Sequence, residues 1–305
     1  MKRREHALQH SVELLSVRGH AVKPVSTNGP GSAAGIARKA IDDGADLILV
    51  AGGDGTINEV VNGMAHSHVP LGILPAGTAN VLANELGIGT TMGRAAHALG
   101  DCVKERIALG LLTAESIATP RHFLLMTGAG LDADIIYHLS PRLKNALGKI
   151  AYWVGGFRKV GSRLTEFTAR AEGMEFTASF ALASRVRNYG GDLEIAPTIS
   201  LLDDEFELVL FEGSNSFTFL WYMLGVVVRK HPSMRGITIL RTRKISFDAP
   251  ANTKIHLQVD GEYAGLAPAT VEIVPNALTL LVPSHFRRRR PASVDETAWT
   301  TSPTR

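Results

Sequence analysis

The fold is decided by the stretch Asp46-Leu47-Ile48-Leu49-Val50-Ala51-Gly52-Gly53-Asp54-Gly55-Thr56. Its first half is a short continuous apolar run, which suits a strand buried on both faces of a parallel sheet. Its three glycines allow a tight turn and let an anionic group approach the backbone amides with no Cβ in the way. Residues 56–64 follow a helical pattern, and Thr56 with Glu59 fits a capping box at the start of that helix.

A phosphate group is the ligand that this strand, loop and helix favour. The first-turn amides and the positive end of the helix dipole face the glycine loop. The alternative is a plain connection between a strand and a helix, but one glycine usually suffices for such a turn. We therefore expect a phosphate to bind at residues 52–56.

A second loop of the same kind follows one unit later in the chain. A predicted buried strand at 71–74 leads into Gly77-Thr78-Ala79-Asn80, and a helical pattern begins at Val81. Thr78 or Asn80 is expected to cap that helix and also to meet a ligand, although an ordinary N-cap is the alternative for this loop alone. Because α/β sheets bind ligands at the carboxyl edge of their strands, the two loops favour one shared nucleotide site.

Residues 1–115 alternate helical and strand patterns, which predicts a domain built on an open parallel α/β sheet. Helices are expected at 2–18 and 32–43, and a short strand at 22–25. No Walker-type sequence occurs in the chain, which excludes a phosphate loop of that kind.

The pattern changes after this first domain. Apolar residues now alternate along short segments, with glycine and proline between them, which predicts an antiparallel β-sandwich for residues 116–283. Stretches at about 140–165 and 217–229 are expected to be helices attached to it. Residues 284–305 lack periodicity and are predicted to form a loose basic tail.

The composition agrees with two domains, because 305 residues exceed what one core usually organises. A formal charge of +3 argues against a protein that coats polyanions, so no nucleic-acid partner is expected. The single cysteine, Cys102, closes no disulfide within the chain and builds no cysteine-rich zinc site. The longest apolar run is about 12 residues, short of the ~18–20 that a spanning helix needs. We therefore expect a cytoplasmic protein.

The aromatic-rich run at 217–224 has two interpretations. A core helix of the second domain is favoured, and a lipid-facing or membrane-surface segment is the alternative. Peripheral contact with the inner face of a membrane is therefore open, and the basic run Arg287–Arg290 would add attraction to anionic lipid heads.

Two acidic segments are candidates for catalysis and for cation binding. Asp260-Gly261-Glu262 ends an alternating strand, where Asp-Gly is a hairpin-turn signal. The functional alternative is a pair of carboxylates, one removing a hydroxyl proton and the other orienting it or helping to hold a cation. Leu201-Leu202-Asp203-Asp204-Glu205-Phe206 offers oxygens that suit Mg²⁺, with an acidic surface turn as an equal alternative.

An ordered series of motifs resembles the diacylglycerol kinase catalytic-domain family, which includes bacterial soluble lipid kinases and the sphingosine kinases. The series comprises Gly52-Gly53-Asp54-Gly55-Thr56-Ile57-Asn58-Glu59, Leu74-Pro75-Ala76-Gly77-Thr78-Ala79-Asn80 and Asp260-Gly261-Glu262. The resemblance extends over residues 5–283 and takes in Gly128-Ala129-Gly130-Leu131-Asp132-Ala133 and Asn188-Tyr189-Gly190-Gly191. Each motif alone is weak, but the ordered set is specific.

The resemblance implies an N-terminal domain like those of phosphofructokinase and NAD kinase, a C-terminal β-sandwich, and an active site between them. It implies transfer of the γ-phosphoryl group of ATP to a lipid hydroxyl, with Mg²⁺. Glu262, with Asp260, would activate the hydroxyl. A structural Mg²⁺ would bind the Asp204 carboxylate and the carbonyls of Leu201 and Phe206. The nucleotide would be held by Thr27, Gly52, Gly53, Asp54, Gly55, Thr56, Ile57, Asn58 and Thr78.

The chain departs from the family pattern in two places. Family members usually open with a strand and an Asn-Pro turn over the phosphates, whereas this chain starts at what should be the following helix. Loss of that strand is expected to expose apolar edges of its neighbours, so either the true start lies upstream or the chain is crippled. In Asp203-Asp204-Glu205 a glycine of the family is missing, which demands a different backbone at position 205.

Three functions remain open from the sequence. A lipid kinase leads. An NAD-kinase-like enzyme also uses a Gly-Gly-Asp-Gly-Thr loop, but there the loop aspartate is the base and no late Asp-Gly-Glu is expected. A catalytically crippled lipid- or nucleotide-binding protein is the third. Diacylglycerol and sphingoid bases stay open as substrates, and a homodimer formed through a sheet edge is a further expectation.

Overall fold

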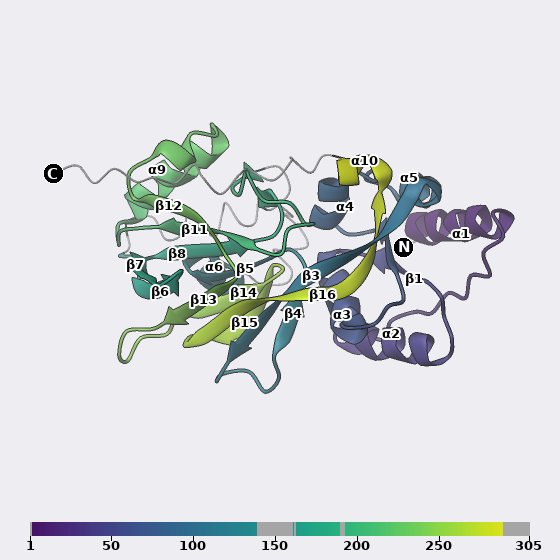
Figure 1. The fold of residues 1–305 in the computed structure, drawn as a ribbon, viewed down its shortest axis with the longest axis horizontal. Helices are drawn as coiled ribbons and strands as arrows, with labels where there is room; N and C mark the ends of the chain where they lie inside the picture. The colour runs from purple at the N-terminus through teal and green to yellow at the C-terminus, as the bar shows by residue number, and fades with distance from the viewer. Residues whose placement is uncertain (1, 139–160, 162, 190–192, 289–305) are drawn as a thin grey trace.

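The computed structural model describes residues 2–138, 161, 163–189 and 193–288, and Figure 1 shows a helix-rich part joined to a sandwich of two sheets. The first part holds α1 (Lys2–Val17), α2 (Ser32–Asp42), β1 (Ile48–Gly52), α3 (Asp54–Met64), β2 (Leu71–Pro75), α4 (Val81–Leu86) and α5 (Met92–Ala98). β1 and β2 are parallel, with Ile48 opposite Leu71 and Gly52 opposite Pro75. The predicted α/β domain with a parallel sheet is confirmed.

The strand predicted at 22–25 is wrong. Residues 20–28 carry no regular structure, and Val25 is exposed. Pro24 has no N–H to donate to a ladder. Among the described residues, β1 pairs with β2 alone, so the outer edge of β1 carries no strand there.

The capping box predicted at Thr56 and Glu59 is also wrong. α3 begins two residues before Thr56, with Gly53 as its N-cap. The Glu59 carboxylate instead accepts hydrogen bonds from the amides of Gly31 at 2.8 Å and Ala33 at 3.0 Å. Glu59 therefore fixes the start of α2, the neighbouring helix, rather than the start of its own.

The second part is the antiparallel β-sandwich that the alternating pattern predicts. One sheet has the order β1-β2-β16-β13-β6-β7, with β3 beside β16 and β4 beside β3, and the other has the order β12-β11-β8-β5-β14-β15. Buried aromatic and aliphatic side chains fill the space between the sheets. The strands of the first sheet are β3 (Cys102–Ala114), β4 (Arg121–Phe123), β6 (Phe167–Ala171), β7 (Met174–Ala178), β13 (Lys244–Asp248) and β16 (Ala269–Pro283). Those of the second are β5 (Met126–Gly130), β8 (Phe180–Ser184), β11 (Phe206–Phe211), β12 (Ile237–Thr242), β14 (His256–Val259) and β15 (Glu262–Leu266).

Two long strands join the parts into one body. β16 pairs along its length with β3, and its Leu280 also lies opposite Leu71 of β2 in a parallel pair. The sheet of the first part thus continues into the sandwich, as Figure 1 shows. This continuity sets the carboxyl ends of β1 and β2 against the edge of the second sheet.

Helices and a small hairpin complete the fold. They are α6 (Leu131–His138), α9 (Ser216–Val227), α10 (Ser284–Arg288), two short 3₁₀ turns (Leu99–Asp101 and His231–Ser233), and the hairpin of β9 (Asn188–Tyr189) and β10 (Leu193–Glu194). The helix predicted at 217–229 is confirmed, whereas most of the stretch at 140–165 lies outside the described residues. The predicted loose tail starts with α10, because buried Phe286 anchors it to the core. None of the described helices has the length and apolar character needed to cross a bilayer.

Candidate active site

A cleft of about 810 Å³ lies where the two parts meet. Its walls come from α1, from the loops that follow β1 and β2, from the chain at 125–126, and from the turn after β14. The predicted residues that line it are Gly52, Gly53, Asp54, Gly55, Thr56, Thr78, Asp260 and Glu262. Segments two hundred positions apart in the sequence therefore share one cavity.

The two glycine loops touch each other through their backbones. A Cβ on Gly77 would lie 2.5 Å from the Cα of Gly53, and a Cβ on Gly53 would lie 3.1 Å from the Cα of Gly77. No side chain fits at either position without moving a backbone. These glycines are needed for the loops to pack together, in addition to any approach of a ligand.

Asp54 links the same two loops. Its carboxylate accepts hydrogen bonds from the amides of Val81 at 3.1 Å and Leu82 at 3.3 Å, at the first turn of α4. Burial raises the pKa of Asp54, and these amides oppose the rise by stabilising the charged form. Asp54 is therefore the acidic cap of α4, and the expected capping by Thr78 or Asn80 side chains is not observed.

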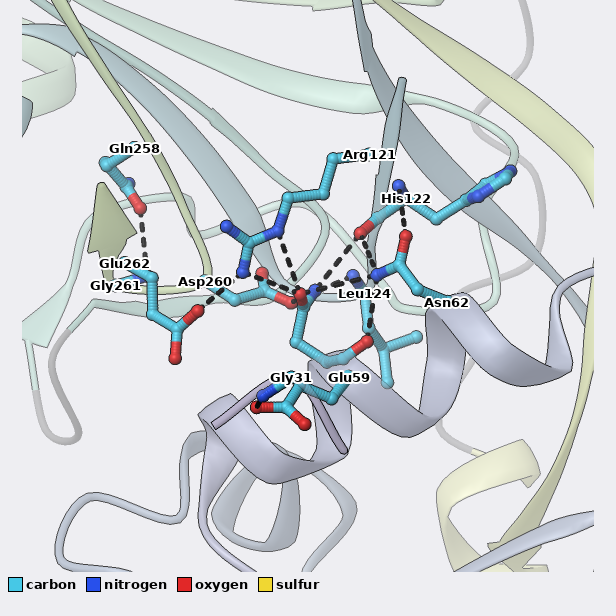
Figure 2. A network of polar contacts seen from close by, with 11 residues as sticks. Gly31, Glu59, Asn62, Arg121, His122, Leu124, Gln258, Asp260, Gly261 and Glu262 are labelled. Atoms are coloured by element: carbon cyan, nitrogen blue, oxygen red, sulfur yellow. Dashed lines mark hydrogen bonds and ion pairs between the residues drawn. The ribbon is translucent and has the colours of Figure 1, made fainter. Parts of the chain in front are cut away.

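Asp260 is buried in a cradle of four N–H donors, of which Figure 2 shows Leu124. Its Oδ1 accepts from the amides of Leu125 at 3.0 Å and Met126 at 2.9 Å. Its Oδ2 accepts from the amide of Leu124 at 3.1 Å and from Asn58 Nδ2 at 2.9 Å. Burial raises the pKa of Asp260, while the four donors oppose the rise. With each oxygen already accepting two bonds, this carboxylate is built to hold the turn after β14.

Of the two predicted acids after β14, Glu262 is the one whose carboxylate remains available in the cleft. Its side chain is 40% exposed, and its Oε2 accepts from Arg121 Nη2 at 2.5 Å. A Cβ on Gly55 would lie 2.5 Å from Glu262 Oε1, so the carboxylate sits against the first turn of α3. A carboxylate next to a helix N-terminus that favours phosphate is the arrangement that proton removal beside a phosphate requires.

Asn58 and Arg121 connect the two acids. Asn58 Oδ1 accepts from Arg121 Nη2 at 3.0 Å, while Asn58 Nδ2 donates to Asp260. Asn62 continues the network through the backbone of His122 (Figure 2). The helix that starts at the glycine loop therefore also holds the acids of the sandwich in register with that loop.

Another buried acid supports the same turn from the opposite side. Asp132, in α6, accepts from Gln258 Nε2 at 2.8 Å and from the Tyr189 hydroxyl. Gln258 Oε1 then accepts from the amide of Gly261 at 2.9 Å. Burial raises the pKa of Asp132 to about 6. Asp132 thus orients Gln258, which orients the residue just before Glu262.

Three residues expected to hold the nucleotide do not line the cleft. Thr27 is exposed in the irregular segment before α2. Ile57 packs in the hydrophobic core, and Asn58 is 1% exposed within the polar network. The side chains of Ile57 and Asn58 therefore support α3 from within rather than meeting a ligand.

One of the three expected metal ligands is already bound by a guanidinium. The carbonyl of Leu201 accepts from Arg185 Nη2 at 2.9 Å. Phe206 is buried and stacks on Phe123, and Asp204 is exposed. Within the described part of the chain, no three histidine, cysteine or acidic side chains are grouped as metal ligands. These residues therefore do not fit a bound Mg²⁺.

Sequence reasoning missed Arg121, Arg185 and the structural use of Asp132. A lone arginine carries no motif, and the partners of Arg121 are 63 and 141 positions away. Asp132 belongs to a segment that the resemblance includes, but Gln258, its hydrogen-bond partner, is 126 positions away and meets it only in the folded chain. A signal in the sequence was the charge of Asp132 and of Arg185 within otherwise apolar segments.

Comparison with known proteins relates both parts of the chain to one group. Residues 1–112 match the family model described as diacylglycerol kinase catalytic domain, and residues 126–282 match a YegS C-terminal NAD kinase beta sandwich-like domain. A diacylglycerol kinase of Bacillus subtilis (strain 168) is 30% identical over 256 residues, which cover 82% of each chain. One of Mycobacterium tuberculosis (strain H37Rv) is 27% identical over 252 residues, 81% of this chain and 80% of that protein.

A solved structure agrees in fold. The crystal structure of a diacylglycerol kinase from Bacillus anthracis str. Sterne superposes with a TM-score of 0.64 at 21% identity. The match covers 86% of this chain and 85% of that one. The order of an α/β part followed by a β-sandwich is therefore shared.

Proposed function

Because the chain belongs to the diacylglycerol kinase family and is a lipid-kinase-like enzyme, we propose that it transfers the γ-phosphoryl group of ATP to the hydroxyl of diacylglycerol. The observation that carries this proposal is the position of the Glu262 carboxylate against Gly55, at the first turn of α3. One cleft thereby offers both a phosphate-binding helix end and a base.

The nucleotide phosphates would bind at the glycine loop after β1. The helix dipole and the first-turn amides of α3 favour negative charge there. Because Asp54 already occupies the first turn of α4, that second helix end is not open to a phosphate. Thr78 lines the cleft next to the loop and would contact the nucleotide. Mg²⁺ would arrive with ATP and supply charge neutralisation on its phosphates.

Glu262 would take the proton of the lipid hydroxyl as that oxygen attacks the γ-phosphorus. The bond from this phosphorus to the β–γ bridging oxygen breaks, and ADP leaves with the electron pair. The hydrogen-bonded ion pair with Arg121 holds the Glu262 carboxylate in place. Asp260 holds the turn, because its oxygens are occupied by the cradle.

An NAD-kinase-like activity is the less supported alternative. It would use the loop aspartate as its base, but both oxygens of Asp54 accept amides of α4. A binding protein without turnover is the other alternative. In that case calorimetry would show binding of ATP with Mg²⁺, and a phosphorylation assay would show no product.

The direct test is a radiolabelled ATP assay with diacylglycerol, a sphingoid base and NAD as separate acceptors. We expect labelled lipid product from diacylglycerol, and a loss of about 10²–10⁴-fold in kcat for Glu262→Gln. Glu175→Gln, another exposed glutamate paired with an arginine, is the matched control and should keep full activity. Labelled NADP without labelled lipid, or full activity in Glu262→Gln, would contradict the proposal.

The same function calls for contact with a membrane, and α9 is the surface that we propose for it. Phe217, Trp221 and Leu224 are exposed along one side of α9, with Val227 and Val228 at its end. The basic pair Arg229-Lys230 follows directly. An exposed apolar helix face flanked by positive charge suits the surface of an anionic bilayer.

Vesicle co-sedimentation tests the membrane surface. We expect binding to vesicles that contain phosphatidylglycerol, and loss of binding in Trp221→Ala with Leu224→Ala. Turnover of a short-chain, water-soluble diacylglycerol should not change in that variant. Unchanged vesicle binding would exclude α9, and self-association lost in the variant would assign this face to a dimer. The open edge of β1 is the alternative dimer surface, which sedimentation equilibrium of the same variant distinguishes.

A further inference from the structure

Arg185, the residue directly after β8, has a charged side chain that is fully buried. It is 0% exposed and is one of the largest side chains that are fully buried in the described part of the chain. The described residues include no acidic partner within salt-bridge distance of it. Its Nη1 and Nη2 donate instead to main-chain carbonyls, while its buried Nε has no hydrogen-bond partner among the described residues. A buried cation without a paired carboxylate needs a reason, because desolvation of the charge is costly.

The carbonyls that Arg185 contacts come from two segments. Nη2 donates to the carbonyl of Leu201 at 2.9 Å and reaches that of Asp203 at 3.4 Å. Nη1 reaches the carbonyl of Leu124 at 3.4 Å. The guanidinium therefore ties the loop before β11 to the segment that leads into β5.

The loop before β11 is the one in which a structural Mg²⁺ is expected. The family resemblance implies a Leu201 carbonyl and an Asp204 carboxylate as metal ligands, but the Leu201 carbonyl already accepts a hydrogen bond from Arg185. The Asp203 carboxylate pairs with Arg241 at 3.0 Å and accepts from the amide of Ser200. Mg²⁺ requires near-octahedral oxygen ligands at ~2.0–2.1 Å, and the positive charge of a guanidinium bound to the Leu201 carbonyl opposes a second cation at that oxygen.

Three aspartate carboxylates act on the charge of Arg185 through space, without contacting it. Asp204, Asp260 and Asp203 all favour its charged form, although burial lowers the pKa of Arg185 to about 10. A guanidinium keeps its positive charge in proteins. The guanidinium is therefore a buried positive charge whose direct contacts are main-chain carbonyls of two segments.

We propose that the Arg185 guanidinium is the built-in structural cation of this chain, replacing a metal ion between the loop before β11 and the segment before β5. This inference goes beyond the proposed function, since it concerns a site that contacts no substrate. Its consequence for the active site is positional. The segment whose carbonyls bind Arg185 also carries the amides of Leu124 and Leu125 that hold Asp260. Arg185 additionally fixes it by donating its own amide to the Leu125 carbonyl at 2.8 Å.

Metal binding in the absence of nucleotide tests the proposal on the wild-type chain. We expect no change in Tm between EDTA and millimolar Mg²⁺, and no bound Mn²⁺ by electron paramagnetic resonance. A rise in Tm with Mg²⁺, or bound Mn²⁺ that Asp204→Asn releases, would overturn the proposal. This measurement does not depend on any variant that might fail to fold or on enzyme activity.

Variants of Arg185 provide the second test. Arg185→Ala should lower Tm by several degrees and gain sensitivity to cations, so that Mg²⁺ or free guanidinium ion partly restores Tm. Arg185→Lys, which keeps the charge, should lose less. Arg170→Ala is the matched control, because Arg170 pairs on the surface of the same sandwich, and neither cation should affect its Tm. An Arg185→Ala protein with wild-type Tm would refute a structural cation, as would equal losses in the alanine and lysine variants.

Discussion

Replacing Asp260 by asparagine separates the structural acid of the cleft from Glu262, the acid that we propose to be catalytic. In the folded chain each Asp260 oxygen accepts two N–H donors. An asparagine side chain has an NH₂ group in place of one carboxylate oxygen. Whichever way the amide is turned, this NH₂ group faces two N–H donors and cannot accept from them, so two hydrogen bonds to a charged acceptor are lost. At about 1.5–3 kcal/mol each, the loss is about 3–6 kcal/mol.

Part of that loss is offset. Burial raises the pKa of Asp260, which means that its charge is costly to bury, and a neutral amide avoids this cost. We therefore expect Asp260→Asn to lose about 2–4 kcal/mol of unfolding free energy, a large part of the total stability of a typical protein. Glu262→Gln breaks a half-exposed ion pair and should lose no more than about 1 kcal/mol.

Urea unfolding followed by circular dichroism measures both variants against the wild type. Asp248→Asn, which removes an exposed carboxylate from an ion pair with Arg170, is the control and should stay within about 1 kcal/mol of the wild type. If Asp260→Asn keeps wild-type stability but loses turnover, Asp260 takes part in the chemistry and the cradle argument is refuted. If Glu262→Gln is the less stable of the two, the roles assigned here are reversed.

Three further predictions concern the glycine loop and the turn after β14. Gly55→Ala should lower kcat while leaving Tm unchanged or higher, because the new Cβ displaces Glu262 Oε1 yet favours the helix; unchanged kcat would contradict the contact. Asp54→Ala removes the cap of α4, so urea unfolding should show a loss of about 0.5–2 kcal/mol together with lost phosphorylation, and full activity would refute the linkage of the loops. The pKa of Asp132 is raised from 3.8 to about 6, so the folded state binds this proton more tightly and the contribution of Asp132 to stability falls as pH rises through that window. In Asp132→Asn the urea midpoint should no longer contain this fall in stability between pH 3.8 and about 6. A difference between variant and wild type that is equal at every pH would contradict the prediction.

The order of elements and the two loops were predictable because they depend on local signals. Apolar runs of strand length, glycines before a helix and period-two alternation each act within about ten residues. The glycine loops converge as expected because parallel strands end at the same edge of a sheet. Strand 22–25 failed as a prediction because a strand needs a neighbouring strand to pair with, and Pro24 lacks a donor.

Partner choice among polar side chains was not predictable. The local pattern assigned Glu59 to its own helix, yet its carboxylate binds amides 26 and 28 positions earlier. Asp260 and Glu262 look equivalent in the sequence, and only their surroundings separate them. Likewise, the acids at 203–205 suggested a metal because nothing local indicates that Arg185, about twenty positions away, donates to the same loop.

The most direct test of the central claim is a crystal structure with a non-hydrolysable ATP analogue and Mg²⁺. The account predicts that the phosphates lie within hydrogen-bond distance of the amides at the start of α3, with the terminal phosphate next to Glu262. Phosphates bound elsewhere in the cleft, away from Glu262 and the loop after β1, would contradict it.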